Sequence, residues 1–213
     1  FRSLGIACAC WALAAQAAND QALLCETATA AAERAESLPS RLLHAISLVE
    51  TGRFDAEKAR VRPWPWSVNA AGEGHWYETK GDAIAAVEAF RRKGVQSIDV
   101  GCMQVNLMFH PEAFSSLDEA FDPTANARYA AKYLVKLRGA DSDWTRAIGA
   151  YHSETPAFGD PYRALVMLRW GSAGPAPTVA QSPYASFQPQ ERVYGAFANS
   201  GRAYRDFPKS MGR

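Results

Sequence analysis

Residues 42–52 read LLHAISLVETG. Leu43, Ile46 and Glu50 follow one another at helical spacing, and Gly52 is a typical helix end. A carboxylate that continues an apolar stripe faces the interior or the edge of a cleft. Burial and the negative end of the helix dipole both disfavour its anion, so we expect the pKa of Glu50 to be raised. That is a property of a general acid; on position alone, a solvated glutamate at a helix end is the plainer alternative.

The segments on either side of this stretch are predicted to be mostly helical. Between Pro63 and Glu78, aromatic residues flank a Gly-rich turn, which predicts a short β-hairpin. The chain is therefore expected to be mainly α with a small β-hairpin insertion. The signals for the helices are a start at Ser37–Ser40 for the helix that ends at Gly52, Thr79 to Lys93, Asp122-Pro123 to Gly139, Trp144 to Tyr151, and a start at Asp160-Pro161.

Composition and charge exclude several classes of protein. The 213 residues are 48% hydrophobic, as in ordinary globular proteins, and 23 Lys+Arg against 22 Asp+Glu leave a net charge of +1. Such a balance argues against nucleic-acid binding and against a polybasic membrane-surface protein. The four histidines form no His-Glu-x-x-His pair and no Cys-x-x-Cys motif is present, so we expect neither a metal nor another cofactor.

The first 17 residues are interpreted as a secretory leader. Arg2 is followed by the apolar stretch 4–15, and Ala15-Gln16-Ala17 has the small-x-small pattern of a cleavage site. The stretch is too short to span a bilayer comfortably, and no other segment approaches that length. We therefore expect export to the periplasm and no membrane span in the mature chain. A buried N-terminal helix is the alternative.

Removal of this leader would leave two cysteines, Cys25 and Cys102, from the four in the sequence. Two cysteines in an exported protein predict one disulfide, with two buried free thiols as the alternative. At the other end, residues 171–213 are rich in Pro, Ser, Ala and Gln without an apolar period, which indicates a flexible tail. Residues 18–170 would then form the working domain.

Three motifs occur in order along that domain. They are Glu50-Thr51-Gly52, Gly101-Cys102-Met103-Gln104 and Ala150-Tyr151-His152-Ser153-Glu154, with Asp122-Pro123-Thr124-Ala125-Asn126 before the third. Together, over about residues 37–170, they resemble the family 1 (Slt-type) lytic transglycosylases, which implies a lysozyme-like, goose-type fold. The chain departs from that family where Thr51 replaces serine, His152 replaces asparagine and Glu154 replaces glycine.

The resemblance also implies roles for individual residues. Glu50 would be the single catalytic acid/base, and the hydroxyl of Tyr151 would orient it. Tyr162 matches a later tyrosine near the cleft less closely. The substrate-binding set implied by the resemblance is Thr51, Met103, Gln104, Tyr151, His152 and Tyr162.

The activity implied is cleavage of the MurNAc–GlcNAc bond of peptidoglycan glycan strands with formation of a 1,6-anhydro product. A small enzyme of this kind resembles those that open the wall for a flagellum or a secretion system. The tail is basic, with five Lys and Arg against two Asp and Glu, and is where a protein partner would bind. A lysozyme-like hydrolase and a non-catalytic glycan-binding scaffold are the alternatives.

Four further residues have two interpretations each. Trp64, Trp66 and Trp76 of the predicted hairpin could stack on sugar rings, although packing in a core is favoured. Asp99 could be a second carboxylate at the cleft, although a structural role in a turn is favoured.

Overall fold

The computed structural model describes residues 6–140 and 143–171, with side chains from residue 21 onward. This part of the chain is mainly helical with two small antiparallel sheets, which confirms the predicted fold class. The helices are α1 (Ile6–Ala35), α2 (Leu42–Thr51), α3 (Lys80–Arg92), α4 (Leu117–Ala120), α5 (Pro123–Arg138), α6 (Trp144–His152) and α7 (Pro156–Gly171). The strands are β1 (Arg53–Asp55), β2 (Arg60–Arg62), β3 (Ser67–Ala70), β4 (Glu73–Trp76), β5 (Ile98–Val100) and β6 (Val105–Asn106).

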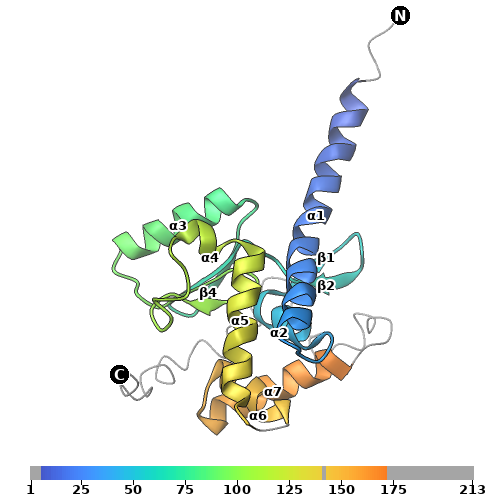
Figure 1. Ribbon diagram of the computed structural model, residues 1–213. Helices are drawn as coiled ribbons and strands as arrows, with labels where there is room; N and C mark the ends of the chain where they lie inside the picture. The colour runs from blue at the N-terminus through green and yellow to red at the C-terminus, as the bar shows by residue number, and fades with distance from the viewer. Residues whose placement is uncertain (1–5, 141–142, 172–213) are drawn as a thin grey trace, which may run out of the picture.

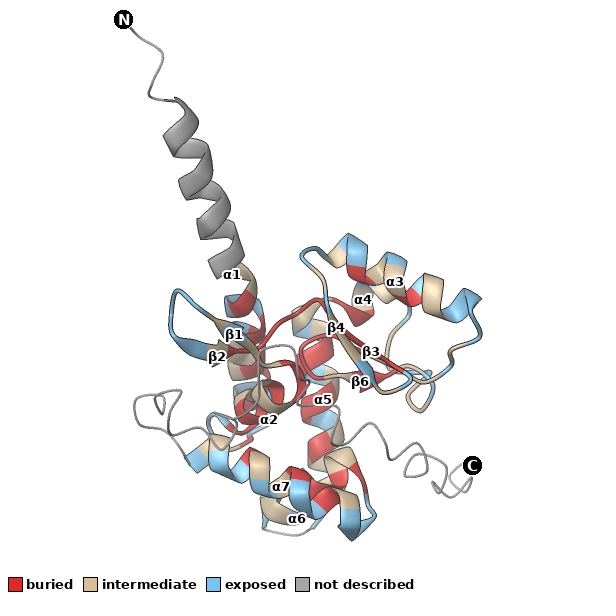
Figure 2. Cartoon of the chain, turned by 180° about the vertical axis from the view of Figure 1, so that it is seen from behind, coloured by how far each residue is buried: buried red, intermediate tan, exposed pale blue. Residues whose placement is uncertain are grey.

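The helical part is built around α5, which packs against α1 and α6, while α7 packs against α2 and α6 (Figure 1). Its core consists of apolar side chains that the helical spacing places on facing sides, and Figure 2 shows such buried positions in red along α2 and α5. Each fully buried aliphatic side chain contributes about 1.5–3 kcal/mol. The largest of them are Leu42, Leu43, Ile46, Leu134, Ile148 and Val166.

A second core lies beneath the four-stranded sheet, whose strand order is β4-β3-β5-β6. Helices α3 and α4 flank this sheet on one side of α5 (Figure 1). β3 and β4 form the hairpin predicted between Pro63 and Glu78, with Ser67 opposite Trp76 in the register. The side chains of this core include Val68, Val87, Ile98, Val100 and Phe121.

The start of α2 differs from its prediction at Ser37–Ser40. The helix begins at Leu42, and its N-cap residue Arg41 has a φ of 66° and no side-chain capping bond. The backbone amides of Arg41 and His44 instead donate to the two carboxylate oxygens of Glu33 in α1, at 2.8 and 3.1 Å. A buried carboxylate from a neighbouring helix therefore caps α2 in place of a local serine.

The start of α7 also differs from its prediction at Asp160-Pro161. The helix begins at Pro156 and contains Pro161. Pro156 occupies the first helical position, where proline is favoured because its missing N–H would have no partner there. Pro161 falls in the second turn, where it costs the helix the bond to the carbonyl of Ala157.

A disulfide between Cys25 and Cys102 joins α1 to the turn after β5, with a Cα–Cα distance of 5.6 Å. This confirms the predicted pairing. The predicted leader, residues 1–17, lies outside the described side chains, and the tail lies outside the described residues beyond Gly171, so both stay predictions. No helix within the described residues is long and apolar enough to cross a membrane.

Candidate active site

Glu50 lies in the last turn of α2 and is 8% exposed. Leu42, Leu43 and Ile46 bury the same helix in the core, so the carboxyl is carried inward with them. At Gly52 the chain turns from α2 into β1. A Cβ at Gly52 would overlap the carbonyl oxygen of Leu48 and lie 2.6 Å from Cγ1 of Val61, so only glycine fits this close approach.

The carboxyl of Glu50 is held by a residue from the far end of the domain. The hydroxyl of Tyr162, on α7, donates a 2.6 Å hydrogen bond to Oε1 of Glu50, and the tyrosine is only 2% exposed. Tyr162, the residue with the weaker sequence match, thus makes a bond of the kind expected of Tyr151. The orienting role of Tyr151 stays a prediction. The hydroxyl of Tyr151 donates to the carbonyl of Met103, at 2.8 Å.

The ring of His152 stacks on the ring of Tyr162, with centroids 4.8 Å apart and planes 10° apart. Burial lowers the pKa of His152 from 6.5 to about 4, so the imidazole is neutral at pH 7. Tyr162, the hydrogen-bond partner of Glu50, therefore packs against a flat ring that adds no positive charge beside the carboxyl. The histidine, which stands where the resemblance implies asparagine, thus supplies an aromatic contact.

The turn Gly101–Gln104 follows β5 and depends on backbone conformations that few residues adopt. Gly101 has a φ of 78° and Gln104 a φ of 48°. A Cβ at Gly101 would lie 2.6 Å from Nδ2 of Asn126, so the close packing of this turn requires glycine.

Asn126, on α5, is fully buried and holds that turn in place. Its Nδ2 donates to the carbonyls of Val100 and Ala120, both at 3.0 Å, and its Oδ1 accepts from the amide of Met103 at 2.9 Å. Because every one of these bonds is buried, loss of the side chain would leave several backbone groups unpaired. From the sequence, Asn126 is named only as the last residue of the motif Asp122-Pro123-Thr124-Ala125-Asn126.

The same turn is tied to the helix that carries Glu50. The hydroxyl of Ser47 donates to the carbonyl of Cys102 at 2.8 Å. The hydroxyl of Thr51 donates to the carbonyl of Ser47 at 3.0 Å and lies 3.4 Å from that of Cys102. Thr51 also accepts from the amide of Trp64, at 3.1 Å. Thr51 and Met103 are both fully buried, so they serve to position this region; their contact with substrate stays a prediction.

Gln104 links the turn to the sheet. Its Nε2 donates to the carbonyls of Ser67 and Gly101, both at 3.1 Å, and its side chain is partly buried. The turn is therefore bonded to α2, α5, α6 and β3, so the positions of Glu50 and Gln104 relative to each other are fixed. A preformed site of this kind loses little entropy when a ligand binds.

The three hairpin tryptophans differ in exposure. Trp64 and Trp66 are 7% and 8% exposed, which supports core packing for both, whereas Trp76 is 39% exposed. The indole N–H of Trp76 donates to the carbonyl of Thr51, at 3.3 Å, and Thr51 follows Glu50 directly. An exposed aromatic residue is therefore bonded to the C-terminal end of the helix that carries Glu50.

Asp99 lies in strand β5 rather than in the expected turn, and its Oδ1 accepts from Nδ2 of Asn106 at 2.7 Å. Burial raises the pKa of Asp99 from 3.8 to about 7, and the bond from Asn106 opposes this in part. The carboxyl thus titrates near neutral pH.

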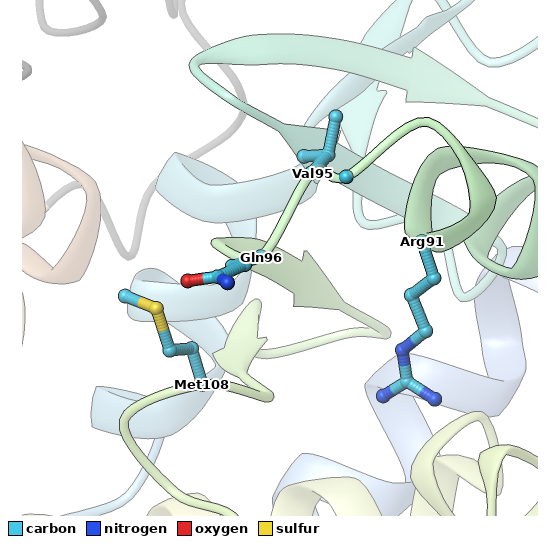
Figure 3. Close-up of a pocket in the computed structure, with 5 residues that line it drawn as sticks. Arg91, Val95, Gln96 and Met108 are labelled. Atoms are coloured by element: carbon cyan, nitrogen blue, oxygen red, sulfur yellow. The ribbon is translucent and has the colours of Figure 1, made fainter.

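One described pocket, of about 370 Å³, is lined by Arg91, Gly94, Val95, Gln96 and Met108 (Figure 3). None of the residues around Glu50 lines this pocket. Within residues 6–140 and 143–171, no group of three or more His, Cys, Asp or Glu side chains could hold a metal ion.

Comparison with known proteins gives one match. Residues 67–159 match the family model of the Transglycosylase SLT domain. Searches of curated proteins and of solved structures gave no significant match. The matched segment contains the Gly101–Gln104 turn and Asn126, whereas Glu50 precedes it and Tyr162 follows it.

Proposed function

We propose that this chain, which contains a transglycosylase SLT domain over residues 67–159 and hence a lysozyme-like fold, is a lytic transglycosylase with Glu50 as its acid/base. The reaction is cleavage of the β-1,4 bond between MurNAc and GlcNAc of peptidoglycan, with formation of 1,6-anhydroMurNAc. The domain supports peptidoglycan as the substrate. The observation that carries the residue assignment is the 2.6 Å bond from Tyr162, which orients a nearly buried carboxyl at the end of α2.

The mechanism needs one carboxyl where ordinary glycosidases use two. The proton of Glu50 passes to the glycosidic oxygen as the bond from that oxygen to C1 of MurNAc breaks. The N-acetyl oxygen of MurNAc stabilises the positive charge at C1. The Glu50 carboxylate then takes the proton of the C6 hydroxyl while that oxygen bonds to C1 and closes the anhydro ring. Glu50 ends protonated, and no water is consumed.

The surroundings of Glu50 suit both halves of this cycle. Burial and the end of the α2 dipole favour the neutral acid before the bond breaks. The hydroxyl of Tyr162 is a neutral donor, and its bond strengthens when the carboxyl becomes an anion. The neutral ring of His152 adds no charge that would hold the anion too strongly.

The test is digestion of purified peptidoglycan followed by mass spectrometry of the muropeptides. The expected products carry 1,6-anhydro ends, and Glu50→Gln removes them while the far-UV circular dichroism stays that of the parent. Glu57→Gln is the matched control, since Glu57 is an exposed glutamate between β1 and β2. Activity of a folded Glu50→Gln variant contradicts the assignment. Reducing ends indicate a hydrolase, and no release of muropeptides indicates a glycan-binding scaffold.

The physiological part of the proposal concerns place and partner. A disulfide forms in oxidising compartments and peptidoglycan lies outside the cytoplasm, which together support action in the periplasm after removal of residues 1–17. The basic tail, residues 171–213, would bind a flagellar or secretion-system protein. Such binding would confine opening of the wall to the place where that protein assembles. Deletion of residues 172–213 should leave cleavage in vitro unchanged and disperse the protein in the cell; unchanged localisation contradicts the tail assignment.

A further inference from the structure

We propose that the indole of Trp76 is a stacking platform for a sugar ring of the glycan, adjacent to Glu50. This inference rests on the proposed function, because it names a binding site for that substrate. It concerns a residue outside the three motifs, on the edge strand β4 of the four-stranded sheet.

The position of Trp76 follows from bonds on two sides. Its Nε1 donates to the carbonyl of Thr51, the neighbour of Glu50. In the sheet it is paired with Ser67, whose carbonyl accepts from Nε2 of Gln104 at 3.1 Å. Trp76 therefore contacts the C-terminal end of α2 and lies opposite the residue to which Gln104 is bonded. A glycan bound at Glu50 and Gln104 is expected to extend to this indole.

The chemistry of the exposed surface fits a sugar. The N–H is the only polar group of an indole, and in Trp76 it is already bonded to Thr51. What remains exposed is apolar ring surface. A pyranose presents a face of C–H groups, which packs on such a ring while its hydroxyls stay hydrated or bonded at the edges. Trp64 and Trp66 offer no such surface, because both are buried.

The hairpin that carries Trp76 is also held to β1. Arg53 pairs with Glu78 at 3.1 Å, two residues after Trp76, and its guanidinium lies 4.5 Å from the ring centroid of Trp64. These contacts hold β1, which follows α2, against the base of the β3–β4 hairpin. A ring on a paired strand, bonded at its N–H, needs little ordering when it binds a ligand.

The experiment measures glycan binding without turnover. The Glu50→Gln protein is titrated with an uncross-linked GlcNAc–MurNAc tetrasaccharide in a calorimeter. Adding Trp76→Ala should weaken binding about tenfold, whereas Trp76→Tyr, which keeps a flat ring, should stay within about threefold. Phe54→Ala is the matched control, because Phe54 is also an exposed aromatic residue, on β1, and this variant should bind as the parent does.

A second readout covers the case in which Trp76→Ala fails to fold. In the Glu50→Gln protein the tetrasaccharide should change tryptophan fluorescence, and Trp76→Phe, which keeps a ring, should remove most of that change. Parental affinity in Trp76→Ala, or an unaltered fluorescence change in Trp76→Phe, overturns the platform.

The proposed function fails on different evidence. If the wild-type protein releases anhydro-muropeptides and Trp76→Ala leaves KM unchanged, the proposed reaction is supported and the stacking role of Trp76 is refuted. If the wild-type protein releases no muropeptides and Trp76→Ala still weakens glycan binding, the stacking role of Trp76 is supported and the proposed reaction is refuted. With both correct, Trp76→Ala raises KM about tenfold and changes kcat little.

Discussion

Tyr162 and Glu50 are 112 residues apart in sequence and are joined by a buried 2.6 Å hydrogen bond. The bond connects the last turn of α2 to α7, two helices that also share the helical core. The orientation of the proposed acid/base is thus decided by packing between the second and the last helix.

Tyr162→Phe should lower kcat while the fold is kept. A hydrogen bond to a charged group contributes about 1.5–3 kcal/mol, so loss of this donor predicts a decrease in kcat of about 10- to 100-fold. The measurement is the rate of muropeptide release, with melting followed by circular dichroism. Tyr129→Phe is the control, because the hydroxyl of Tyr129 bonds to His110 and Glu112 instead. Parental kcat in Tyr162→Phe would refute the role of this bond.

Gly101→Ala should destabilise the protein more than Gly94→Ala does. Both glycines have a positive φ, 78° and 82°, so both substitutions carry backbone strain of about 1–2 kcal/mol. Only at Gly101 would the new Cβ meet another group, Nδ2 of Asn126 at 2.6 Å, whereas nothing lies within 4 Å at Gly94. The excess loss at Gly101 should be about 1–3 kcal/mol in urea unfolding. Equal losses would show that the turn can move away from Asn126.

Asp99→Asn should change how stability depends on pH. The carboxyl of Asp99 has a pKa of about 7 in the folded protein and about 3.8 when solvated, so the folded state holds this proton more tightly. Its contribution to stability is full below pH 4 and is lost as the pH rises through 7. Relative to the parent, Asp99→Asn should therefore gain stability between pH 4 and 7, measured by urea unfolding at several pH values. Parallel stability curves for the two proteins would contradict the raised pKa.

Replacing Cys25 and Cys102 by alanine should lower the free energy of unfolding by about 2–5 kcal/mol, since the bond closes a long loop. Activity should fall as well, because Cys102 lies within the turn that the hydroxyls of Ser47 and Thr51 hold. The check is thermal melting with and without a reducing agent. The reducing agent should lower the melting temperature of the parent and leave the double variant unchanged. A parent insensitive to complete reduction would contradict the prediction.

Local signals predicted the hairpin and helices α2, α3, α5, α6 and α7, although α2 and α7 begin elsewhere than expected, whereas α1 and α4 were not predicted. Thr79 and Asp122 cap α3 and α5 through their side chains as expected, and Gly52 follows α2. The β3–β4 hairpin was recognisable because its turn and its aromatic flanks are contiguous. Strands β5 and β6 have three and two residues, too few for a period to show, and they exist through pairing with β3 and with each other.

Contacts between elements that are far apart in the chain could not be predicted from the sequence. The cap of α2 comes from Glu33, eight residues before Arg41 and on another helix, so no spacing rule finds it. Motif order pointed to Glu50, whereas the bond that Tyr162 donates to it depends on the packing of α7 against α2. The exposure of Trp76 beside two buried tryptophans depends likewise on which face of the hairpin meets the core.

The pairing of an early helix with the last one has a consequence for the time at which the protein becomes active. A chain synthesised from its N-terminus contains Glu50 long before residue 162 has been added. Until α7 has arrived and packed against α2, the carboxyl lacks its tyrosine. An unfinished chain therefore carries the Glu50 carboxyl without the residue that aligns it, and the candidate site is complete only when the last described helix has folded.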